Sequence, residues 1–520
     1  MGRQTMASCL RGSLALMKQV VVTGDPLAAA DVVAVAHRRA EALMGDGVPD
    51  RMAGARGVVE AAVDGDVPVY GVTTGFGALA TTRVDASLSG EMQTALLRSH
   101  AAGVGDPLSA EMVRAMLLLR ARTLAQGHSG VRPVIVERLL EMLRRDLLPV
   151  VPDRGSVGAS GDLAPFAHLA LPIIGEGFLT EGGVAAPAAD VLARHDLDPI
   201  ELYPKEGLSL LNGTEGMLSF GVLGSERAHH IIDAGDIACA LSVEALLGSV
   251  RPFAPEVHAL RPHPGQARSA ERIRAALAGS EIVASHRHDF VHAVQDAYSL
   301  RCAPQVHGAV RDVLDHADGV FERELGSVVD NPIVFPETGE VVSGGNFHGQ
   351  PLAFALDFMA IAVAEVASIS ERRTDRILDP DRSSGLPPFL STHPGLNSGF
   401  MIAQYTAAAL VAENRVLSHP ASVDSVPTSG LQEDHVSMGW GAGRKLGTVL
   451  DNAAWVVAIE LLCAAEGTRH RSPLRPGAGT AAALAAIREI VEPLDRDRPP
   501  APDIEAISGL IAAGAFSDLV

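Results

Sequence analysis

The chain has 520 residues, of which 47% are hydrophobic and 20% are charged, so it is neither disordered nor of low complexity. Asp and Glu number 62 against 42 Lys and Arg, which gives a net charge of −20. Such an acidic chain repels phosphate backbones, and nucleic acid is not expected as a partner. Four cysteines in a chain of this length exclude a disulfide scaffold, and the lack of a C-x-x-C pair excludes a zinc knuckle and a redox motif, which favours a cytoplasmic location.

The chain divides into a mixed first part and a mainly helical remainder. Strands are expected at 20–24, 67–72 and 341–343. Helices are expected where apolar residues recur with helical spacing, at 107–126, 131–147, 216–247, 351–378, 399–417, 443–467 and 478–492. We therefore expect a mixed N-terminal domain over residues 1–127, which carries Tyr70 and His100, and an elongated helical domain over residues 128–520.

Two of the expected helices are almost continuously apolar. The stretch 352–369 is interrupted by Asp357 and Glu365, and the stretch 453–465 by Glu460. No uncharged apolar stretch reaches the ~18–20 residues that a membrane-spanning helix needs. Both helices are therefore expected to be buried in a large bundle or an oligomer, and no membrane is expected as a partner.

Seven stretches rich in Gly, Asn, Ser and His lie between apolar segments, which is where a rigid scaffold holds functional loops. They are residues 70–77, 98–105, 155–171, 210–216, 295–308, 330–351 and 422–439. The third contains Ala159, Ser160 and Gly161. If the chain bends tightly, which Gly161 does not oppose, the Gly161 nitrogen can attack the Ala159 carbonyl carbon. The five-membered ring closes with loss of one water molecule. Loss of a second water, from the Ser160 hydroxyl, gives 4-methylideneimidazol-5-one, a strong electrophile.

In this order, the seven motifs resemble those of the histidine ammonia-lyases, within the wider family of aromatic amino acid lyases and aminomutases. The resemblance extends from residue 20 to residue 507. It implies a mainly α, fumarase/aspartase-like fold with a small mixed α/β N-terminal domain and a long central helical bundle. It also implies a carbon–nitrogen lyase with the prosthetic group described above, without metal or nucleotide. The assembly implied is a homotetramer whose active sites combine residues from three chains.

The resemblance also implies roles for single residues near the electrophile. Tyr70 matches the catalytic tyrosine that takes the β-proton, a role for which its pKa must be lowered. Asn212, in LLNGT, matches the residue that hydrogen-bonds the electrophile, as an oxyanion-hole donor does. Phe347, in SGGNFHG, matches a residue packed beside the electrophile.

The segment YSLRC carries the groups implied to hold the substrate. Arg301 is expected to bind the substrate carboxylate, because its planar guanidinium fits a carboxylate with two parallel hydrogen bonds. Tyr298 falls near the same face if the segment is helical. By resemblance Tyr298 is catalytic and Gln295 binds substrate.

Two positions decide the substrate. His100 occurs at the position where tyrosine-specific relatives also carry His, so it argues against phenylalanine without separating tyrosine from histidine. Glu433 stands where tyrosine-specific relatives have a neutral amide. A carboxylate accepts the imidazole N–H and stabilises a positively charged ring, which a phenol does not need. The resemblance therefore implies L-histidine as substrate, with trans-urocanate and ammonia as products, the first step of histidine degradation.

Three other interpretations remain open. A tyrosine ammonia-lyase or aminomutase would keep the same fold and prosthetic group. A metal-dependent hydrolase could use His286, His288 and His292, whose H-x-H-x3-H spacing suits zinc. A catalytically inactive helical assembly protein would lack the prosthetic group. The sequence also departs from the family pattern at Ala297, where Pro is frequent, and at His307, where a larger apolar residue is common.

Overall fold

The computed structural model describes residues 17–65, 67–286 and 294–520. Contacts within the chain divide it into two compact units. Unit 1 consists of Met1–Val222, Phe321–Ala353 and Asp424–Gly441, and unit 2 consists of Leu223–Val320, Phe354–Val423 and Ala442–Val520. The boundary expected between residues 127 and 128 falls inside unit 1. The units differ from the expected domains because the chain, after leaving unit 1, returns to it twice.

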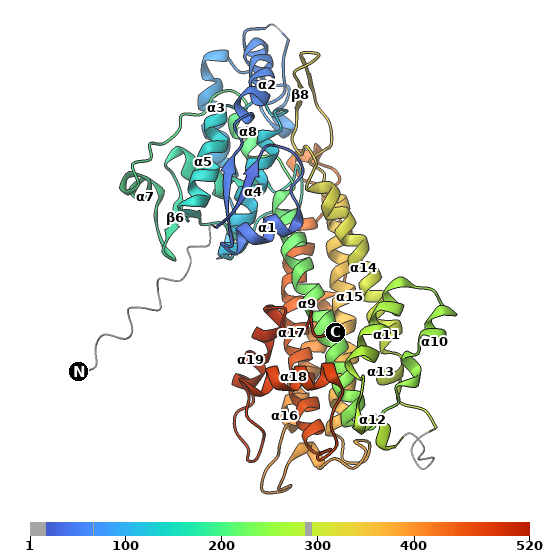
Figure 1. Cartoon of the computed structure of the whole chain (residues 1–520). Helices are drawn as coiled ribbons and strands as arrows, with labels where there is room; N and C mark the ends of the chain where they lie inside the picture. The colour runs from blue at the N-terminus through green and yellow to red at the C-terminus, as the bar shows by residue number, and fades with distance from the viewer. Residues whose placement is uncertain (1–16, 66, 287–293) are drawn as a thin grey trace, which may run out of the picture. The chain divides into compact units, whose positions relative to one another are not determined.

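Unit 1 mixes helices with short strands (Figure 1). Its elements are β1 (Lys18–Val22), α1 (Ala29–Ala36), β2 (Ala40–Met44), α2 (Val48–Val63), α3 (Ser89–His100), β3 (Val104–Pro107), α4 (Ala110–Ala125), α5 (Pro133–Arg144), β4 (Leu148–Pro149), β5 (Pro152–Arg154), α6 (Leu163–Ala170), β6 (Phe178–Glu181), β7 (Val184–Pro187), α7 (Ala188–Arg194), α8 (Glu206–Leu211), β8 (Ile333–Phe335) and β9 (Glu340–Val342). Helix α4 is buried along nearly its whole length and packs against α1 and α5. Its Ala- and Leu-rich sequence therefore forms the core of the unit.

The strands of unit 1 form small separate sheets. Strand β1 pairs with β2 in parallel, with Lys18 opposite Ala40 and Val22 opposite Met44. The other pairings are antiparallel and join β3 to β5, β4 to β6, β6 to β7, and β8 to β9. The strands expected at 20–24 and 341–343 are confirmed as β1 and β9, with their ends displaced by one or two residues.

The strand expected at 67–72 is wrong. This segment forms a turn, in which the amides of Val72 and Thr73 both donate to the Val69 carbonyl oxygen. Gly71 within it has a φ of 66°, a left-handed conformation that a strand does not contain. Pro68 also lacks the amide hydrogen that a strand pairing would use.

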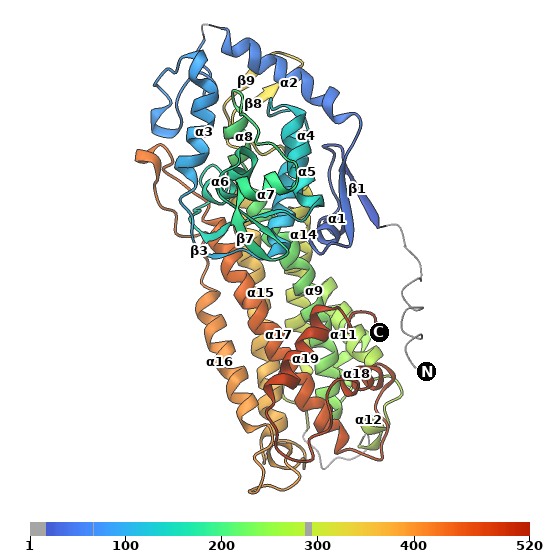
Figure 2. The ribbon, with the colours of Figure 1, turned by 90° about the vertical axis from the view of Figure 1, so that its left-hand side faces the viewer.

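Unit 2 is helical. Its elements are α9 (Glu215–Ala245), α10 (Pro255–Ala259), α11 (Pro264–Ala276), α12 (Glu281–Ser285), α13 (Tyr298–Arg301), α14 (Ala303–Glu324), α15 (Gln350–Leu378), α16 (Met401–Leu417), α17 (Gly439–Arg469), α18 (Ala478–Arg488) and α19 (Ala501–Ala512), of which α9, α14, α15 and α17 also have residues in unit 1. In Figures 1 and 2 these four long helices run side by side in unit 2. The helices expected from apolar periodicity are all found, with ends shifted by a few residues.

Short 3-10 helices complete the fold. They are η1 (Gly77–Leu79), η2 (Ala86–Leu88), η3 (Leu171–Ile174), η4 (Arg251–Phe253), η5 (Pro388–Leu390) and η6 (Ser429–Leu431). Two of them frame the cavity described below: η1 follows the turn that carries Tyr70, and η6 precedes Glu433. These short elements position loops rather than build the core.

By length and composition alone, α15 and α17 could cross a membrane. However, 67% and 78% of their most apolar windows lie buried inside the structure. Buried core helices meet the same criterion, so this composition is weak evidence for a membrane span.

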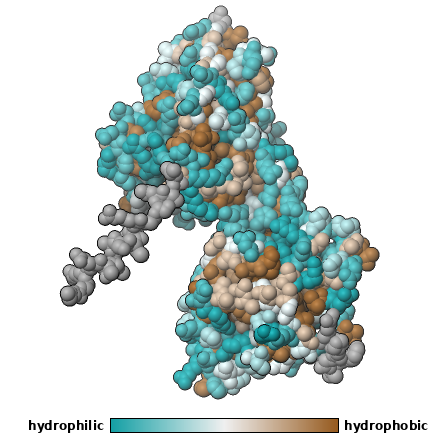
Figure 3. Space-filling model, in the orientation of Figure 1, coloured by the Kyte–Doolittle hydropathy of each residue, from teal (hydrophilic) through white to brown (hydrophobic). Residues whose placement is uncertain are grey.

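Apolar side chains also remain on the surface, and Figure 3 shows such patches on both units. In unit 2, α15 and α16 expose a series of large apolar side chains, namely Phe354, Phe358, Ile361, Ile402, Tyr405 and Val416. Phe354 and Phe358 stack with their ring centroids 6.1 Å apart, and an exposed apolar patch of this kind is typical of an interaction surface.

Candidate active site

A cavity of about 730 Å³ in unit 1 brings together side chains from five separate segments. Its lining includes Tyr70, His100, Ser160, Asn212 and Glu433, all expected from the sequence to form one site. His100 is the last residue of α3, and Asn212 directly follows α8. The long-range packing of unit 1 therefore brings the hydroxyl of Ser160 together with a phenol, an imidazole, an amide and a carboxylate.

Glu433 lies next to the tripeptide. The Ser160 hydroxyl donates to Glu433 Oε1 at 3.4 Å, and the Thr428 hydroxyl donates to Oε2 at 2.6 Å. Backbone hydrogen bonds join Thr428 and Glu433 in both directions and close the turn around η6. The carboxylate is thus fixed on its loop and directed toward Ser160.

The tripeptide has the tight bend that cyclisation requires. Ser160 has a φ of 51° and Gly161 a φ of 78°. A Cβ atom on Gly161 would lie 2.0 Å from the carbonyl oxygen of Gly213, so only glycine fits there. The Asp162 amide donates to the same carbonyl at 2.9 Å. The LLNGT loop is therefore in direct contact with the backbone of residues 161 and 162.

The side-chain amide of Asn212 makes one hydrogen bond and keeps further hydrogen-bonding capacity on the side of the cavity. Its Nδ2 donates to the Asn331 carbonyl oxygen at 2.8 Å, while its Oδ1 is buried without a hydrogen-bond partner in the described part of the chain. An orphaned buried polar atom is uncommon and points to a missing partner. The amide nitrogen carries two hydrogens, so Nδ2 can donate the second one to a neighbouring group while it keeps the bond to Asn331, as the expected role of Asn212 requires.

Arg120 of α4 holds this loop from behind, a role that the sequence analysis missed. It is fully buried, donates to the carbonyl oxygens of Ser209 and Asn212 at 2.8 and 3.1 Å, and pairs with Glu215. Its guanidinium also lies 5.4 Å from the ring centroid of Phe166 in α6. The signal was a set of charged residues, Arg114, Arg120 and Arg122, in a helix rich in apolar residues, because a buried charge needs dedicated partners.

Asp162 is also buried, and its carboxylate accepts from the Met217 amide at 2.9 Å and from the Ser156 hydroxyl at 3.2 Å. Burial, supported by the nearby charge of Glu215, raises the pKa of Asp162 to about 7. The residue after the tripeptide thus links it to the start of α9.

The pKa of Tyr70 is raised, so the expected lowering is wrong for the chain described here. Burial is the main cause, and the charge of Glu433 adds to it. The Gly77 amide donates to the Tyr70 hydroxyl at 3.0 Å and opposes these effects only in part. The sequence could not foresee this direction, because the burial of the Tyr70 phenol and its closeness to Glu433 arise only in the fold.

His100 is held as a neutral ring. Its Nδ1 lies 3.0 Å from the Leu96 carbonyl oxygen, which can only accept, so Nδ1 carries the hydrogen and Nε2 is left as an acceptor. Burial lowers the pKa of His100 despite the nearby Glu433. His100 can therefore accept a hydrogen bond from a ligand at neutral pH.

The YSLRC residues belong to unit 2 and are not among the residues that line the unit 1 cavity. The prediction that Tyr298 and Arg301 share a face is confirmed, because the segment is the helix α13 and the Arg301 guanidinium lies 4.5 Å from the Tyr298 ring centroid. Tyr298 is 72% exposed. Gln295 lines a cavity of about 470 Å³ in unit 2. Phe347 lies in unit 1, half-buried, but outside the described lining of the 730 Å³ cavity.

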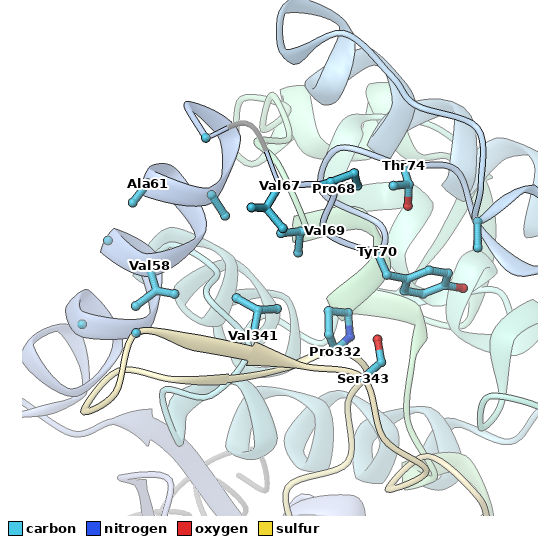
Figure 4. Close-up of a pocket in the computed structure, with 16 residues that line it drawn as sticks. Val58, Ala61, Val67, Pro68, Val69, Tyr70, Thr74, Pro332, Val341 and Ser343 are labelled. Carbon is cyan, nitrogen blue, oxygen red and sulfur yellow. The ribbon is translucent and has the colours of Figure 1, made fainter.

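A second, larger cavity of about 910 Å³ adjoins the turn that carries Tyr70. Figure 4 shows Val58, Val69 and Val341 around it, with the Tyr70 hydroxyl pointing away from Val58 and Val341. Tyr70 is the one titratable residue among its described lining residues. The larger cavity therefore lacks the groups for acid–base chemistry, and the smaller one is the candidate active site.

The metal interpretation cannot be followed in full, because His288 and His292 lie outside the described residues. Both ring nitrogens of His286 lie near carbonyl oxygens, 3.0 Å from that of Ile282 and 3.1 Å from that of Gly248. Within residues 17–65, 67–286 and 294–520, no three His, Cys, Asp or Glu side chains form a group that could hold a metal ion.

Comparison with known proteins gives consistent matches over nearly the whole chain. The sequence model of the aromatic amino acid lyase family matches residues 27–489. The histidine ammonia-lyase of Gloeobacter violaceus is 52% identical over 509 residues, which cover 96% of this chain and 97% of the relative. The solved tyrosine aminomutase from Streptomyces globisporus has a TM-score of 0.92 and 40% identity, covering 96% and 98% of the two chains. For histidine ammonia-lyase from Trypanosoma cruzi, the values are 0.89 and 41%, covering 96% and 94%.

Proposed function

This chain belongs to the aromatic amino acid lyase family, and on that premise we propose that it is a carbon–nitrogen lyase that converts L-histidine into trans-urocanate and ammonia. This reaction is the first step of histidine degradation. The observation that carries the choice of substrate is the carboxylate of Glu433, 3.4 Å from the Ser160 hydroxyl inside the cavity. It offers an acceptor to an imidazole N–H and stabilises the ring when it is positively charged.

The residues fit the 4-methylideneimidazol-5-one group that is expected from the sequence. Residues 159–161 would form it, and Asn212 would hold it with the second hydrogen of its amide nitrogen. When present, the group supplies an electrophile that draws electrons from the substrate and makes the amine a better leaving group. The close packing of Gly161 on Gly213 maintains the bend from which the ring forms.

Tyr70 is the proposed base for the β-proton. Its raised pKa means that a proton would leave the phenol only with help from a positive group. We infer that this group comes from a second copy of the chain, whose Gln295, Tyr298 and Arg301 complete the cavity. Arg301 would bind the substrate carboxylate there, and the same positive charge would lower the pKa of Tyr70.

A shared active site requires an oligomer, and the proposal therefore includes a homotetramer. The exposed apolar side chains of α15 and α16 support it, because a partner would cover them. A cytoplasmic location and independence from metal ions and nucleotides stay predictions.

The test is to incubate the purified protein with L-histidine and to follow the ultraviolet absorbance of the conjugated product. The proposal predicts urocanate formation, with L-tyrosine a much poorer substrate. The likeness to a tyrosine aminomutase makes tyrosine the relevant competitor. Faster conversion of tyrosine than of histidine would favour the aminomutase or tyrosine-lyase alternative. Activity on histidine that chelators abolish would instead favour the metal interpretation.

A further inference from the structure

Unit 2 buries a group of charged and titratable side chains between its four long helices. Asp236 comes from α9, His307 and Arg311 from α14, Arg373 from α15 and Glu460 from α17, and each is 0% exposed. A buried charge is costly unless it is paired and hydrogen-bonded, so these side chains need one another. His307, which departs from the family pattern, is at the centre of the group.

Two ion pairs satisfy the carboxylates. Arg373 binds Glu460 with two nitrogens, one of them 2.7 Å from Oε2, and the Ser242 hydroxyl donates to Oε1 at 2.6 Å. Asp236 accepts from His307 Nδ1 at 2.7 Å and from Arg311 at 2.6 Å. Because Nδ1 carries its hydrogen, neutral His307 presents Nε2 as an acceptor, 3.4 Å from Nη1 of Arg373.

The same Nη1 of Arg373 reaches out of this group to α13. It donates to the Ser299 carbonyl oxygen at 3.3 Å. Ser299 lies between Tyr298 and Arg301 in a helix of only four residues. So short a helix has few internal hydrogen bonds, and its orientation depends on anchors outside it. In the described chain these anchors include the buried side chain of Leu300 and the contact with Arg373.

We propose that Arg373 is a positioning residue for substrate binding, which holds the Ser299 carbonyl and so sets the direction in which α13 presents Arg301 and Tyr298. The inference rests on the proposed function, in which Arg301 binds the substrate carboxylate. Glu460 fixes the guanidinium from the opposite side, so the position of α13 follows that of the helical bundle.

The test variant is Arg373→Met combined with Glu460→Gln, which removes both charges and leaves no unpaired ion in the core. We expect a folded protein whose KM for L-histidine rises roughly tenfold or more, the effect of losing one charge-assisted hydrogen bond, while kcat changes less. Inhibition by urocanate, which has a carboxylate, should weaken in parallel. Inhibition by histamine, which lacks the carboxylate, should stay unchanged.

A second readout does not depend on activity. Hydrogen exchange at the amides of Arg301, in α13, and of Cys302, directly after it, should become faster in the variant. These two amides donate to the carbonyl oxygens of Ala297 and Tyr298, so their protection depends on the short helix alone. The matched control is Arg311→Met with Asp236→Asn, an equally buried pair whose hydrogen bonds do not reach α13. The amide oxygen at position 236 still accepts from His307 Nδ1, and Arg272 remains beside Asp233. This control should lower the melting temperature and leave KM and α13 exchange unchanged.

Unchanged KM and unchanged α13 exchange in the Arg373 variant would overturn the inference, as would the same changes in the Arg311 control. If the double variant does not fold, Arg373→Lys replaces it, because lysine keeps the charge beside Glu460 but lacks the planar fork that reaches Ser299. If the wild-type protein does not convert histidine, the proposed function fails, whereas faster α13 exchange would still support the anchoring by Arg373.

Discussion

The cavity of unit 1 and the helix α13 of unit 2 carry the two halves of the predicted site, and their side chains are held in different ways. In unit 1 close main-chain packing acts together with the buried Arg120: Gly161 packs on Gly213, and Asn212 donates to the carbonyl oxygen of Asn331. In unit 2 the anchoring groups are buried charges, while Tyr298 itself is 72% exposed. In the proposal, the electrophile forms inside one chain and a partner copy supplies the substrate-anchoring groups.

The two regions also differ in charge. The unit 1 cavity contains the carboxylate of Glu433, which raises the pKa of Tyr70, and α13 carries the cation Arg301. Each half therefore lacks what the other supplies. Variants in unit 1 should mainly affect the chemical step, and variants around α13 should mainly affect binding of the carboxylate.

The largest effect is expected for Ser160→Ala. Without the hydroxyl, the second water cannot be lost and the electrophile cannot form, so kcat should fall by at least about a thousandfold. Circular dichroism and the oligomeric state should match the wild type, because Ser160 makes only a long hydrogen bond to Glu433. Ser87→Ala, in an exposed turn, is the control and should keep full activity. Wild-type turnover in Ser160→Ala would contradict a catalytic role for the tripeptide.

Stability should depend on pH in opposite directions in the two units. The folded pKa of Asp162 is raised to about 7 from 3.8, so its contribution is complete below pH 3.8 and is lost as the pH rises through 7. The folded pKa of buried His307 is lowered from 6.5, so its contribution is present above pH 6.5 and is lost as the pH falls.

Two variants separate these contributions in urea unfolding measured across pH. The unfolding free energy of the wild type should fall by up to about 4 kcal/mol between acidic and neutral pH through Asp162, and this fall should be absent in Asp162→Asn. In His307→Gln the unfolding free energy should instead fall less steeply as the pH is lowered below 6.5. If both variants kept the wild-type pH profile of unfolding free energy, the two groups would not titrate as their burial implies.

Glu433→Gln should reduce kcat/KM for L-histidine by roughly a hundredfold, because the amide cannot stabilise a positively charged imidazole. Its melting temperature should change little, since Gln keeps an acceptor for the Thr428 hydroxyl. Asp434→Asn, at the exposed neighbouring position, is the matched control and should retain its activity. Loss of equal size in both variants would assign the effect to the loop rather than to Glu433.

The smallest effect compares two glycines of unit 1 with left-handed backbones. Gly161→Ala should cost at least about 2 kcal/mol more in unfolding free energy than Gly182→Ala. Gly161 has a φ of 78° and its added Cβ would collide with Gly213, whereas Gly182 has a φ of 59° and nothing within 4 Å. An equal loss of unfolding free energy in both variants would mean that the LLNGT loop is not packed closely against the tripeptide.

The sequence predicted the long helices and the grouping of the unit 1 site, because apolar periodicity and whole motifs are local signals. It failed at 67–72, where a turn around Gly71 replaces the expected strand. It also failed on the pKa of Tyr70, which is raised mainly by burial of the phenol and further by Glu433, a carboxylate far away in the sequence. Arg120 and Arg373 were missed for the same reason, since their roles follow from carbonyl groups that only the fold brings near them.

Residues 159–161 are proposed to become an electrophile, and the intact mass of the purified protein distinguishes the cyclised from the linear tripeptide. Cyclisation predicts a mass lower than that of the linear sequence by two water molecules. Digestion should locate this difference in the peptide that contains Ser160, and Ser160→Ala should not show it. A full linear mass in a protein that converts L-histidine would contradict this proposal.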